Sequence, residues 1–111
     1  MKYDLRRLQA EYAKLGRQLA QTGWISHGYV QDRGPGAGGP CYQWTRKERK
    51  KTVSVALSLE QYLGMREAIQ NWRRLQATLT RMEQISRTIL FHSLPNPHRR
   101  KPLTPKVLGL K

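Results

Sequence analysis

Five cations fall within six residues at Arg46-Lys47-Glu48-Arg49-Lys50-Lys51. The neighbouring sequence predicts a hairpin here, and its tip would carry these side chains away from the sheet. A cationic hairpin can enter a groove of a nucleic acid or straddle two rows of phosphates, and each neutralised phosphate releases counterions. The alternative interpretation is a solvated turn whose charges keep sheet edges from pairing.

Cations elsewhere in the chain favour phosphate binding over that alternative. The chain has 21 Lys and Arg against seven Asp and Glu, a formal net charge of +14. Such an excess repels itself unless a polyanion neutralises it, and a phosphate backbone is the readiest polyanion in a cell. The residues predicted to contact nucleic acid are Arg46, Lys47, Arg49, Lys50, Lys51, Arg66, Arg73, Arg74, Arg81, Arg99, Arg100 and Lys101.

The cations outside the hairpin belong to three segments. On the helix predicted after Ser58, Arg66, Arg73 and Arg81 repeat over about 22 Å, a length that can follow several phosphates. The tail sequence His98-Arg99-Arg100-Lys101 resembles a nucleic-acid-binding arm that orders on contact. The first predicted helix adds Arg6, Arg7, Lys14 and Arg17.

Aromatic residues suggest a second mode of contact, because an exposed ring can stack on an unpaired base. Tyr42 and Trp44 alternate along a predicted strand and therefore share one face, which makes them the candidates for base stacking. Trp24 and Tyr29 belong to the same predicted sheet. In a chain of 111 residues a sheet aromatic more often packs beneath the helices, so packing is the favoured interpretation of this group.

The residues that catalysis or metal binding would need are scattered. Cys41 is the only cysteine, and His27, His92 and His98 have no metal-ligand spacing. The glycine-rich segment lacks a phosphate-loop motif, and the acids form no paired arrangement. We therefore expect no enzymatic activity, metal, cofactor or small-molecule substrate. A nuclease would require three acids to converge on a metal, namely Asp32, Glu48 and Glu60.

No run of residues approaches the roughly 18 to 20 apolar residues of a membrane-spanning helix. The Met1 end also lacks the apolar segment of a secretory signal. The sequence accordingly predicts a cytoplasmic protein without membrane contact.

Leucine spacing predicts the first helix. From Asp4 to Thr22 the apolar residues recur every three or four positions and form one stripe. Gly23 is expected to end this helix in the left-handed conformation. Within it, Glu11 is expected to be a partial partner of Arg7. The stripe consists of Leu5, Leu8, Tyr12, Leu15 and Leu19.

Three strands of an antiparallel meander are predicted to follow. Trp24–Val30 is short and aromatic, while Cys41–Arg46 and Thr52–Leu57 alternate in side-chain type as half-buried strands do. Asp32–Pro40, rich in glycine and proline, is predicted to be a loop too flexible for helix or strand. Lys47–Lys51 is predicted to be the hairpin tip.

A long second helix is predicted to start with the S-x-x-Q capping box of Ser58 and Gln61. It should end near Phe91 or Ser93, because Pro95 cannot continue it. Its arginines, including Arg87, fall opposite an apolar sector made of Met65, Ala68, Ile69, Trp72, Leu75, Leu79, Met82 and Ile89.

The predicted fold class is α+β, with an N-terminal helix, a three-stranded antiparallel meander, a long C-terminal helix and a basic proline-rich tail. The two helices are expected to pair antiparallel through their leucine-rich stripes. Residues 1–93 are predicted to form a single nucleic-acid-binding domain and residues 94–111 a flexible tail. The long helix has more apolar surface than one partner can cover, which suggests a homodimer.

Two stretches, G-P-C-Y-Q-W-T-R-K at Gly39–Lys47 and K-T-V-S-V-A-L-S at Lys51–Ser58, resemble a family of small basic bacterial proteins of unknown function. Its members are encoded beside transposases and other mobile-element genes, or fused to them. The resemblance continues through Ala68–Leu75 and Met82–Ser86. It implies a mobile-element context and contact with DNA or a structured RNA. Some longer relatives carry extra cysteines before the G-P-x-Y motif, whereas Cys41 stands alone here.

The sequence thus predicts a nucleic-acid-binding accessory protein, linked to a mobile element or a ribonucleoprotein, that contacts mainly the phosphate backbone of DNA or structured RNA. The alternative is a protein-interaction adaptor whose long helix docks on a transposase or an RNA-guided nuclease. In that case the charge would serve only solubility and local concentration.

Overall fold

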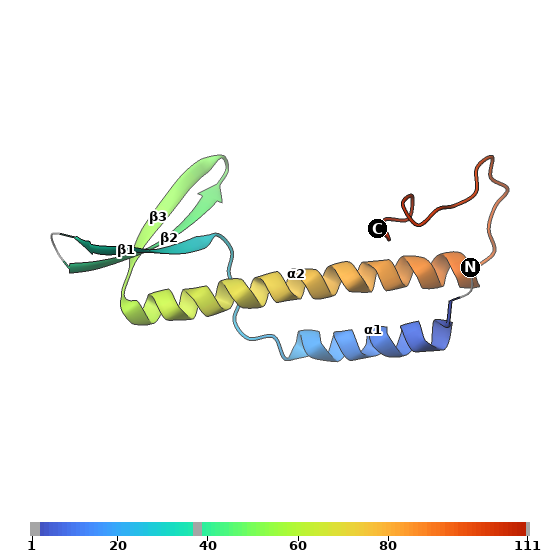
Figure 1. Ribbon diagram of the computed structural model, residues 1–111, viewed down its shortest axis with the longest axis horizontal. Coiled ribbons are helices and arrows are strands. Elements are labelled where there is room, and N and C mark those ends of the chain that lie inside the picture. The colour runs from blue at the N-terminus through green and yellow to red at the C-terminus, as the bar shows by residue number, and fades with distance from the viewer. Residues whose placement is uncertain (1–2, 37–38, 111) are drawn as a thin grey trace. The chain divides into compact units, whose positions relative to one another are not determined.

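The computed structural model describes residues 3–36 and 39–110. Its elements, in chain order, are α1 (Leu5–Ala20), β1 (Tyr29–Gly36), β2 (Gly39–Glu48), β3 (Lys51–Leu57) and α2 (Leu59–Ser93) (Figure 1). The strands form one antiparallel sheet in the order β1-β2-β3. This is the α+β fold that the sequence predicts.

The chain divides into two compact units that share α2. We call residues 1–21 and 76–111 the helix unit, and residues 22–75 the sheet unit. The first turns of α2 belong to the sheet unit and its later turns to the helix unit. The predicted division into one domain over residues 1–93 and a flexible tail over residues 94–111 stays a prediction.

The first helix begins where Asp4 caps it. The Asp4 carboxylate accepts a hydrogen bond of 3.1 Å from the backbone N–H of Arg7, as an N-cap residue should. The helix ends at Ala20, and the prediction that Gly23 ends it in the left-handed conformation is wrong, since Gly23 has no positive φ. Gly23 instead allows a close approach, because a Cβ there would lie 3.0 Å from the Asn71 side chain.

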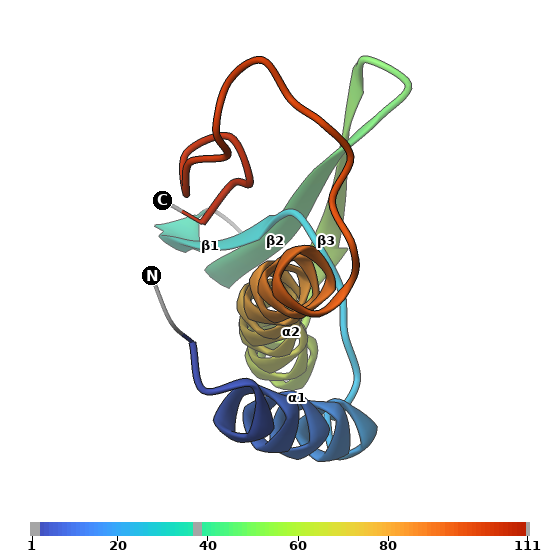
Figure 2. The same ribbon diagram turned by 90° about the vertical axis from the view of Figure 1, so that its right-hand side faces the viewer.

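In the helix unit, α1 runs antiparallel to the later turns of α2, as predicted (Figures 1 and 2). The Tyr3 ring lies 4.6 Å from the His92 ring at one end of the pair. Further along, Arg81 donates two hydrogen bonds of 2.6 and 2.9 Å to the two carboxylate oxygens of Glu11. The expected pairing of Glu11 with Arg7 is therefore secondary, because the main partner is supplied by the other helix.

The glycine-rich segment contradicts its prediction as a loop. Residues 29–36 form β1 and pair with β2, so residues 32–36, the first half of the segment predicted to be flexible, are in a strand. Residues 39–40 belong to β2, while residues 37–38 lie outside the described residues. A register shift between Asp32 and Pro35 marks a bulge, where Gly34 has a φ of 75°. The Asp32 carboxylate accepts a 2.9 Å hydrogen bond from the Gly34 N–H and fixes this bend.

The segment before β1 also differs from its prediction. Residues 24–28 are not a strand, and only Tyr29 and Val30 of the predicted strand Trp24–Val30 belong to β1. Residues 24–28 instead cross α2. The N–H of Ser26 donates a 3.2 Å hydrogen bond to the carbonyl oxygen of Ala68 in that helix. A backbone N–H that is hydrogen-bonded to a helix in this way cannot also pair with a neighbouring strand.

The second helix follows its sequence signals closely. The Gln61 N–H donates to the Ser58 hydroxyl at 3.1 Å, and the Ser58 N–H donates to the Gln61 side-chain oxygen at 2.9 Å, which confirms the capping box. The helix ends at Ser93, as predicted. Ile69 is 5 % exposed in the sheet unit and Ile85 is fully buried in the helix unit, whereas Leu79, predicted in the apolar sector, is 40 % exposed.

We predict that Glu11→Gln lowers stability at neutral pH. The hydrogen bond from Arg81 holds the pKa of the Glu11 carboxyl below its usual value, so this contribution exists above the ordinary glutamate pKa. It disappears as the pH falls through the lowered folded-state pKa. Both side chains are more than a third exposed, which limits the effect to about 1 kcal/mol or less. Urea unfolding at several pH values measures it.

Glu67→Gln is the matched control, because Glu67 is exposed and has no partner among the described residues, while its loss raises the net charge equally. Equal destabilisation by both variants, or a Glu11 effect that persists at pH 2, would contradict the prediction.

Candidate nucleic-acid interface

The tip of the β2–β3 hairpin places four of its five cations in solvent. The pairing of Glu48 with Lys51 leaves Arg49 and Lys50 as a two-residue turn, narrower than the predicted tip Lys47–Lys51. Lys47, Arg49, Lys50 and Lys51 are all exposed, and none has a partner within the described residues. This group, which we call the tip cations, is open to a phosphate backbone.

The turn itself holds these charges at a conformational cost. Arg49 has a φ of 47° and Lys50 a φ of 70°, as a turn that matches the twist of a tight hairpin requires. Asparagine and glycine are the residues favoured there, because glycine has no β-carbon to clash in the left-handed region and the short polar side chain of asparagine can hydrogen-bond locally. Non-glycine residues in this region carry strain of about 1 kcal/mol or more each. The turn thus places two cations where the backbone conformation favours other residues.

The fifth cation of the tip, Arg46, has a different role. Its guanidinium lies over the Trp44 ring at 4.4 Å from the centroid, and its Nε donates a 3.2 Å hydrogen bond to Glu48. The side chain is only 23 % exposed. Trp44 in turn donates a 2.7 Å hydrogen bond from Nε1 to the His27 carbonyl oxygen. Arg46 therefore positions Trp44 and the strand, and is less accessible to phosphate than the tip cations.

Both residues predicted to stack on bases are already in contact with other groups. One face of the Trp44 ring is covered by Arg46, and the Tyr42 ring lies 4.8 Å from the Tyr62 ring of α2. Arg66 lies over that Tyr62 ring at 5.5 Å. Tyr42 and Trp44 are half-buried, as packing residues are.

The predicted arginine stripe on α2 separates into residues with different partners. Arg73 is exposed and has no partner among the residues described, while Arg74 donates to the Asn71 side-chain oxygen. Arg81 is bound to Glu11, and Arg87 donates a 3.3 Å hydrogen bond to Glu83. The stripe is therefore not a uniform row of accessible charges. In the sheet unit Arg73 is exposed without a partner among the described residues, and Arg66 is exposed but lies over the Tyr62 ring.

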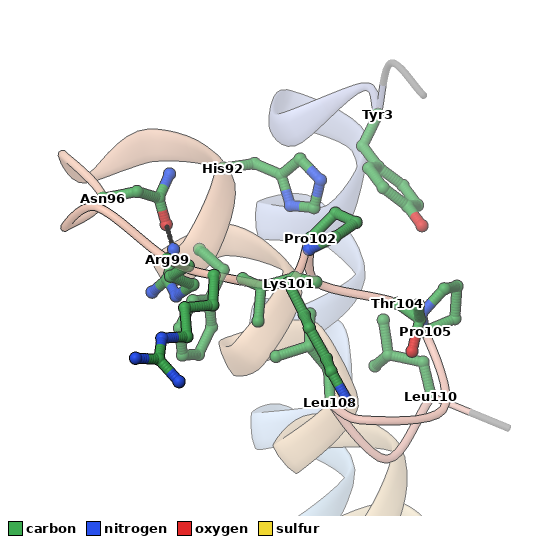
Figure 3. A pocket seen from close by; sticks show the side chains of 13 residues that line it. Tyr3, His92, Asn96, Arg99, Lys101, Pro102, Thr104, Pro105, Leu108 and Leu110 are labelled. Atoms are coloured by element: carbon green, nitrogen blue, oxygen red, sulfur yellow. Dashed lines mark hydrogen bonds between the residues drawn. The ribbon is translucent and has the colours of Figure 1, made fainter.

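The tail cations line a pocket of the helix unit (Figure 3). Arg99 donates a 2.7 Å hydrogen bond to the Asn96 side-chain oxygen and lies 5.8 Å from the Phe91 ring centroid. Arg100 and Lys101 line the same pocket, together with His92 and Tyr3, and no acid is among its lining residues. Three of the four residues of the predicted tail cluster, Arg99, Arg100 and Lys101, thus line one cavity, and His98 does not.

The end of the tail forms a small capped turn that the sequence analysis missed. The Thr104 hydroxyl accepts a 3.3 Å hydrogen bond from the Val107 N–H, which caps its start. At its end Gly109 has a φ of 73°, and the N–H of Leu110 donates a 2.8 Å hydrogen bond to the Pro105 carbonyl oxygen. This is the Schellman pattern, and the T-P-x-x-x-G spacing is the signal that could have revealed it.

The sequence analysis also missed the exposure of Trp24. This side chain is 92 % exposed, although the sequence placed it in a strand beneath the helices. Its own backbone is held, since the Asn71 Nδ2 donates a 2.9 Å hydrogen bond to the Trp24 carbonyl oxygen. No local pattern distinguishes this residue from a core tryptophan, because its exposure follows from the crossing of residues 22–28 over α2.

Across residues 3–36 and 39–110, no group of three or more His, Cys, Asp or Glu side chains is arranged to hold a metal ion. Asp32, Glu48 and Glu60 therefore form no such group. None of the described helices is long and apolar enough to cross a membrane.

Comparison with known proteins gives no relative: no family model, no curated protein and no solved structure matches this chain. The resemblance of Gly39–Ser58 to mobile-element proteins therefore stays a prediction, and the function has to be argued from the residues themselves.

We predict that replacing the strained turn by Arg49→Asn with Lys50→Gly raises the free energy of unfolding by about 1 kcal/mol. Asparagine and glycine adopt a positive φ at low cost, so the hairpin is relieved of strain. Urea unfolding measures the change. The control, Arg49→Ala with Lys50→Ala, removes the same charges but keeps a β-carbon at both positions and should show no such gain. An equal gain in both variants would assign the effect to charge instead of backbone strain.

Proposed function

We propose that this protein binds the phosphate backbone of DNA or of a structured RNA, as an accessory to a mobile element or a ribonucleoprotein. The observation that carries the proposal is the turn at Arg49 and Lys50, which keeps two exposed cations in a backbone conformation that favours other residues. A solvated turn without a ligand would have no need for these side chains, since Asn-Gly is both soluble and less strained.

Charge elsewhere supports the same class of ligand. The sheet unit has nine Lys and Arg against four Asp and Glu, and the tail pocket is lined by three cations and no acid. Because the sequence groups its cations without a recognisable base-reading helix, contact is expected to depend on charge and shape. The mobile-element context comes from the sequence resemblance alone, and we place the protein in the cytoplasm as part of this proposal.

The affinity for nucleic acid should fall steeply with salt. We predict that the log of the association constant falls linearly with the log of the salt concentration, and that each lost phosphate contact reduces the slope by about 0.7 to 0.9. The two variants Arg49→Asn/Lys50→Gly and Arg49→Ala/Lys50→Ala should therefore both lose about 1.4 to 1.8 from the slope. Fluorescence anisotropy with a labelled oligonucleotide from low to physiological salt measures it.

These two variants are informative because Arg49→Asn/Lys50→Gly is expected to be more stable than the natural protein while binding nucleic acid less tightly. A loss of binding in that variant cannot come from unfolding. An affinity that does not change with salt, or a turn variant that binds as tightly as the natural protein, would contradict phosphate binding at the tip.

We further predict that the tip contributes more than the tail. Replacing Arg49, Lys50 and Lys51 by glutamine removes three exposed cations, and replacing Arg99, Arg100 and Lys101 by glutamine removes the same charge from the tail. Arg99 is held by Asn96 and Phe91, so fewer tail cations are open. The same titrations compare the two triple variants. A larger loss from the tail variant would make the sheet unit a scaffold for the tail.

A second candidate function is a protein-interaction adaptor, favoured by apolar side chains that α2 leaves in solvent. Leu59, Leu63, Leu79 and Leu90 are 40 to 51 % exposed. A transposase or a nuclease docked on α2 would cover them. Purification from cells with and without nuclease treatment separates the two functions, because an adaptor keeps its partner after the nucleic acid is digested.

A further inference from the structure

Trp24 combines a fixed backbone with a side chain in solvent. At 92 % exposed it is the most exposed of the large hydrophobic side chains among the described residues. Tryptophan loses more than other side chains by remaining in water, so full exposure of its ring is unusual. A ring exposed only because its segment is loose would need no explanation, but this segment is tied down at three points.

Two of these three hydrogen bonds join the segment to α2 and one joins it to β2. Asn71 of α2, itself 9 % exposed, donates its Nδ2 to the Trp24 carbonyl oxygen. The N–H of Ser26 donates to the Ala68 carbonyl oxygen of α2 at 3.2 Å, and the His27 carbonyl oxygen accepts from Trp44 of β2 at 2.7 Å. The ring of Trp24 is thus presented from a segment whose backbone is already ordered, so little entropy is lost when a ligand covers it.

The other aromatic rings of the sheet unit are less accessible. The Trp44 ring lies under Arg46, Tyr42 lies against Tyr62, and Trp72 is half-buried. Tyr29, which follows the same tied segment, is 50 % exposed. Trp24 is therefore the most exposed of the described Trp and Tyr side chains in this unit.

The net charge of the sheet unit favours a polyanion. Arg74 donates to the Asn71 side-chain oxygen, and Asn71 donates to the Trp24 carbonyl oxygen, so this arginine is linked to the Trp24 backbone; the pocket that Trp24 lines has Glu60 as its charged residue. The sheet unit as a whole carries more than twice as many cations as acids. Aromatic rings beside cationic side chains are the combination by which proteins bind single strands, with bases stacked on rings and phosphates on cations.

We infer that Trp24 stacks on an unpaired base, so that the ligand of this protein is a nucleic acid with single-stranded bases. This inference rests on the proposed function and narrows it from any phosphate backbone to one with accessible bases. In a duplex the base faces are already stacked, and Trp24 then has nothing to cover it.

The test compares three polymers that differ in their bases. A single-stranded oligonucleotide offers charge and bases, an oligonucleotide of the same length made of abasic sites offers charge alone, and a duplex offers stacked bases. We expect the natural protein to bind the single strand more tightly than the abasic strand. Trp24→Ala should weaken single-strand binding about 5- to 150-fold and leave abasic and duplex binding unchanged, while Trp24→Phe should keep most of the affinity.

The variants are suited to this test because the ring contacts little of the folded protein. Thermal unfolding should give the same midpoint for the natural protein and Trp24→Ala. Ile25→Ala is the neighbouring control, since Ile25 is 47 % exposed on the same segment, and it should leave single-strand binding unchanged.

Each outcome decides a different point. If the natural protein binds the single strand and the abasic strand equally and Trp24→Ala changes neither, base stacking is overturned while phosphate binding stands. If the natural protein binds none of the three polymers, the proposed function fails together with this inference. If Trp24→Ala leaves all nucleic-acid binding intact but releases a protein that co-purifies after nuclease treatment, Trp24 belongs to a protein interface and the inference is overturned.

Discussion

The arrangement of the sheet unit depends on the two hydrogen bonds of the Asn71 side chain. Its amide is nearly buried and uses both ends, donating to the Trp24 carbonyl oxygen and accepting from Arg74. A buried amide left without partners costs about 1 to 3 kcal/mol, so this site holds the crossing segment in a single position. Gly23 contributes by having no β-carbon where the amide approaches. The path into β1, and with it the sheet, starts from this contact.

The buried apolar core of this protein is small for the charge that the chain carries. Among the described residues, the buried hydrophobic side chains are Ile69 and Ile85, one in each unit. A core of this size leaves little stability to offset repulsion among 21 cations, so specific hydrogen bonds carry a larger share than usual. The hydrogen bonds from Arg81 to Glu11 and from Arg46 to Glu48 belong to this group.

Features encoded by neighbouring residues were predictable from the sequence. The capping box of Ser58 and Gln61, the end of α2 before Pro95 and the hairpin formed by β2 and β3 all depend on short-range patterns, and the structure confirms them. The extent of β1 was not predictable in this way, because a bulge at Gly34 lets a glycine-rich segment continue its pairing with β2.

Features that join distant residues were beyond the sequence patterns. Glu11 and Arg81 are 70 residues apart, so their bond follows from how the two helices pair and not from any spacing. The same holds for Trp24, whose exposure depends on Asn71, 47 residues away. For the candidate interface, composition identified the cations, but only the structure separates Lys47, Arg49, Lys50 and Lys51, which are open, from Arg46, which is packed.

The capped turn at Thr104–Leu110 changes how the tail is attached to the rest of the protein. Leu108 and Leu110 are half-buried, and Gly109 lies against the Arg87 guanidinium, where a β-carbon would be 2.9 Å from a guanidinium nitrogen. Residues 94–103 therefore run from the end of α2 to a turn that lies against Arg87 of the same helix, so any flexible part of the tail is joined to the helix at both ends. A segment joined at both ends samples a smaller volume than an arm with a free end, so it encounters fewer ligand molecules. It also has less freedom left to lose, so a ligand that reaches Arg100 and Lys101 is held at a lower entropic cost.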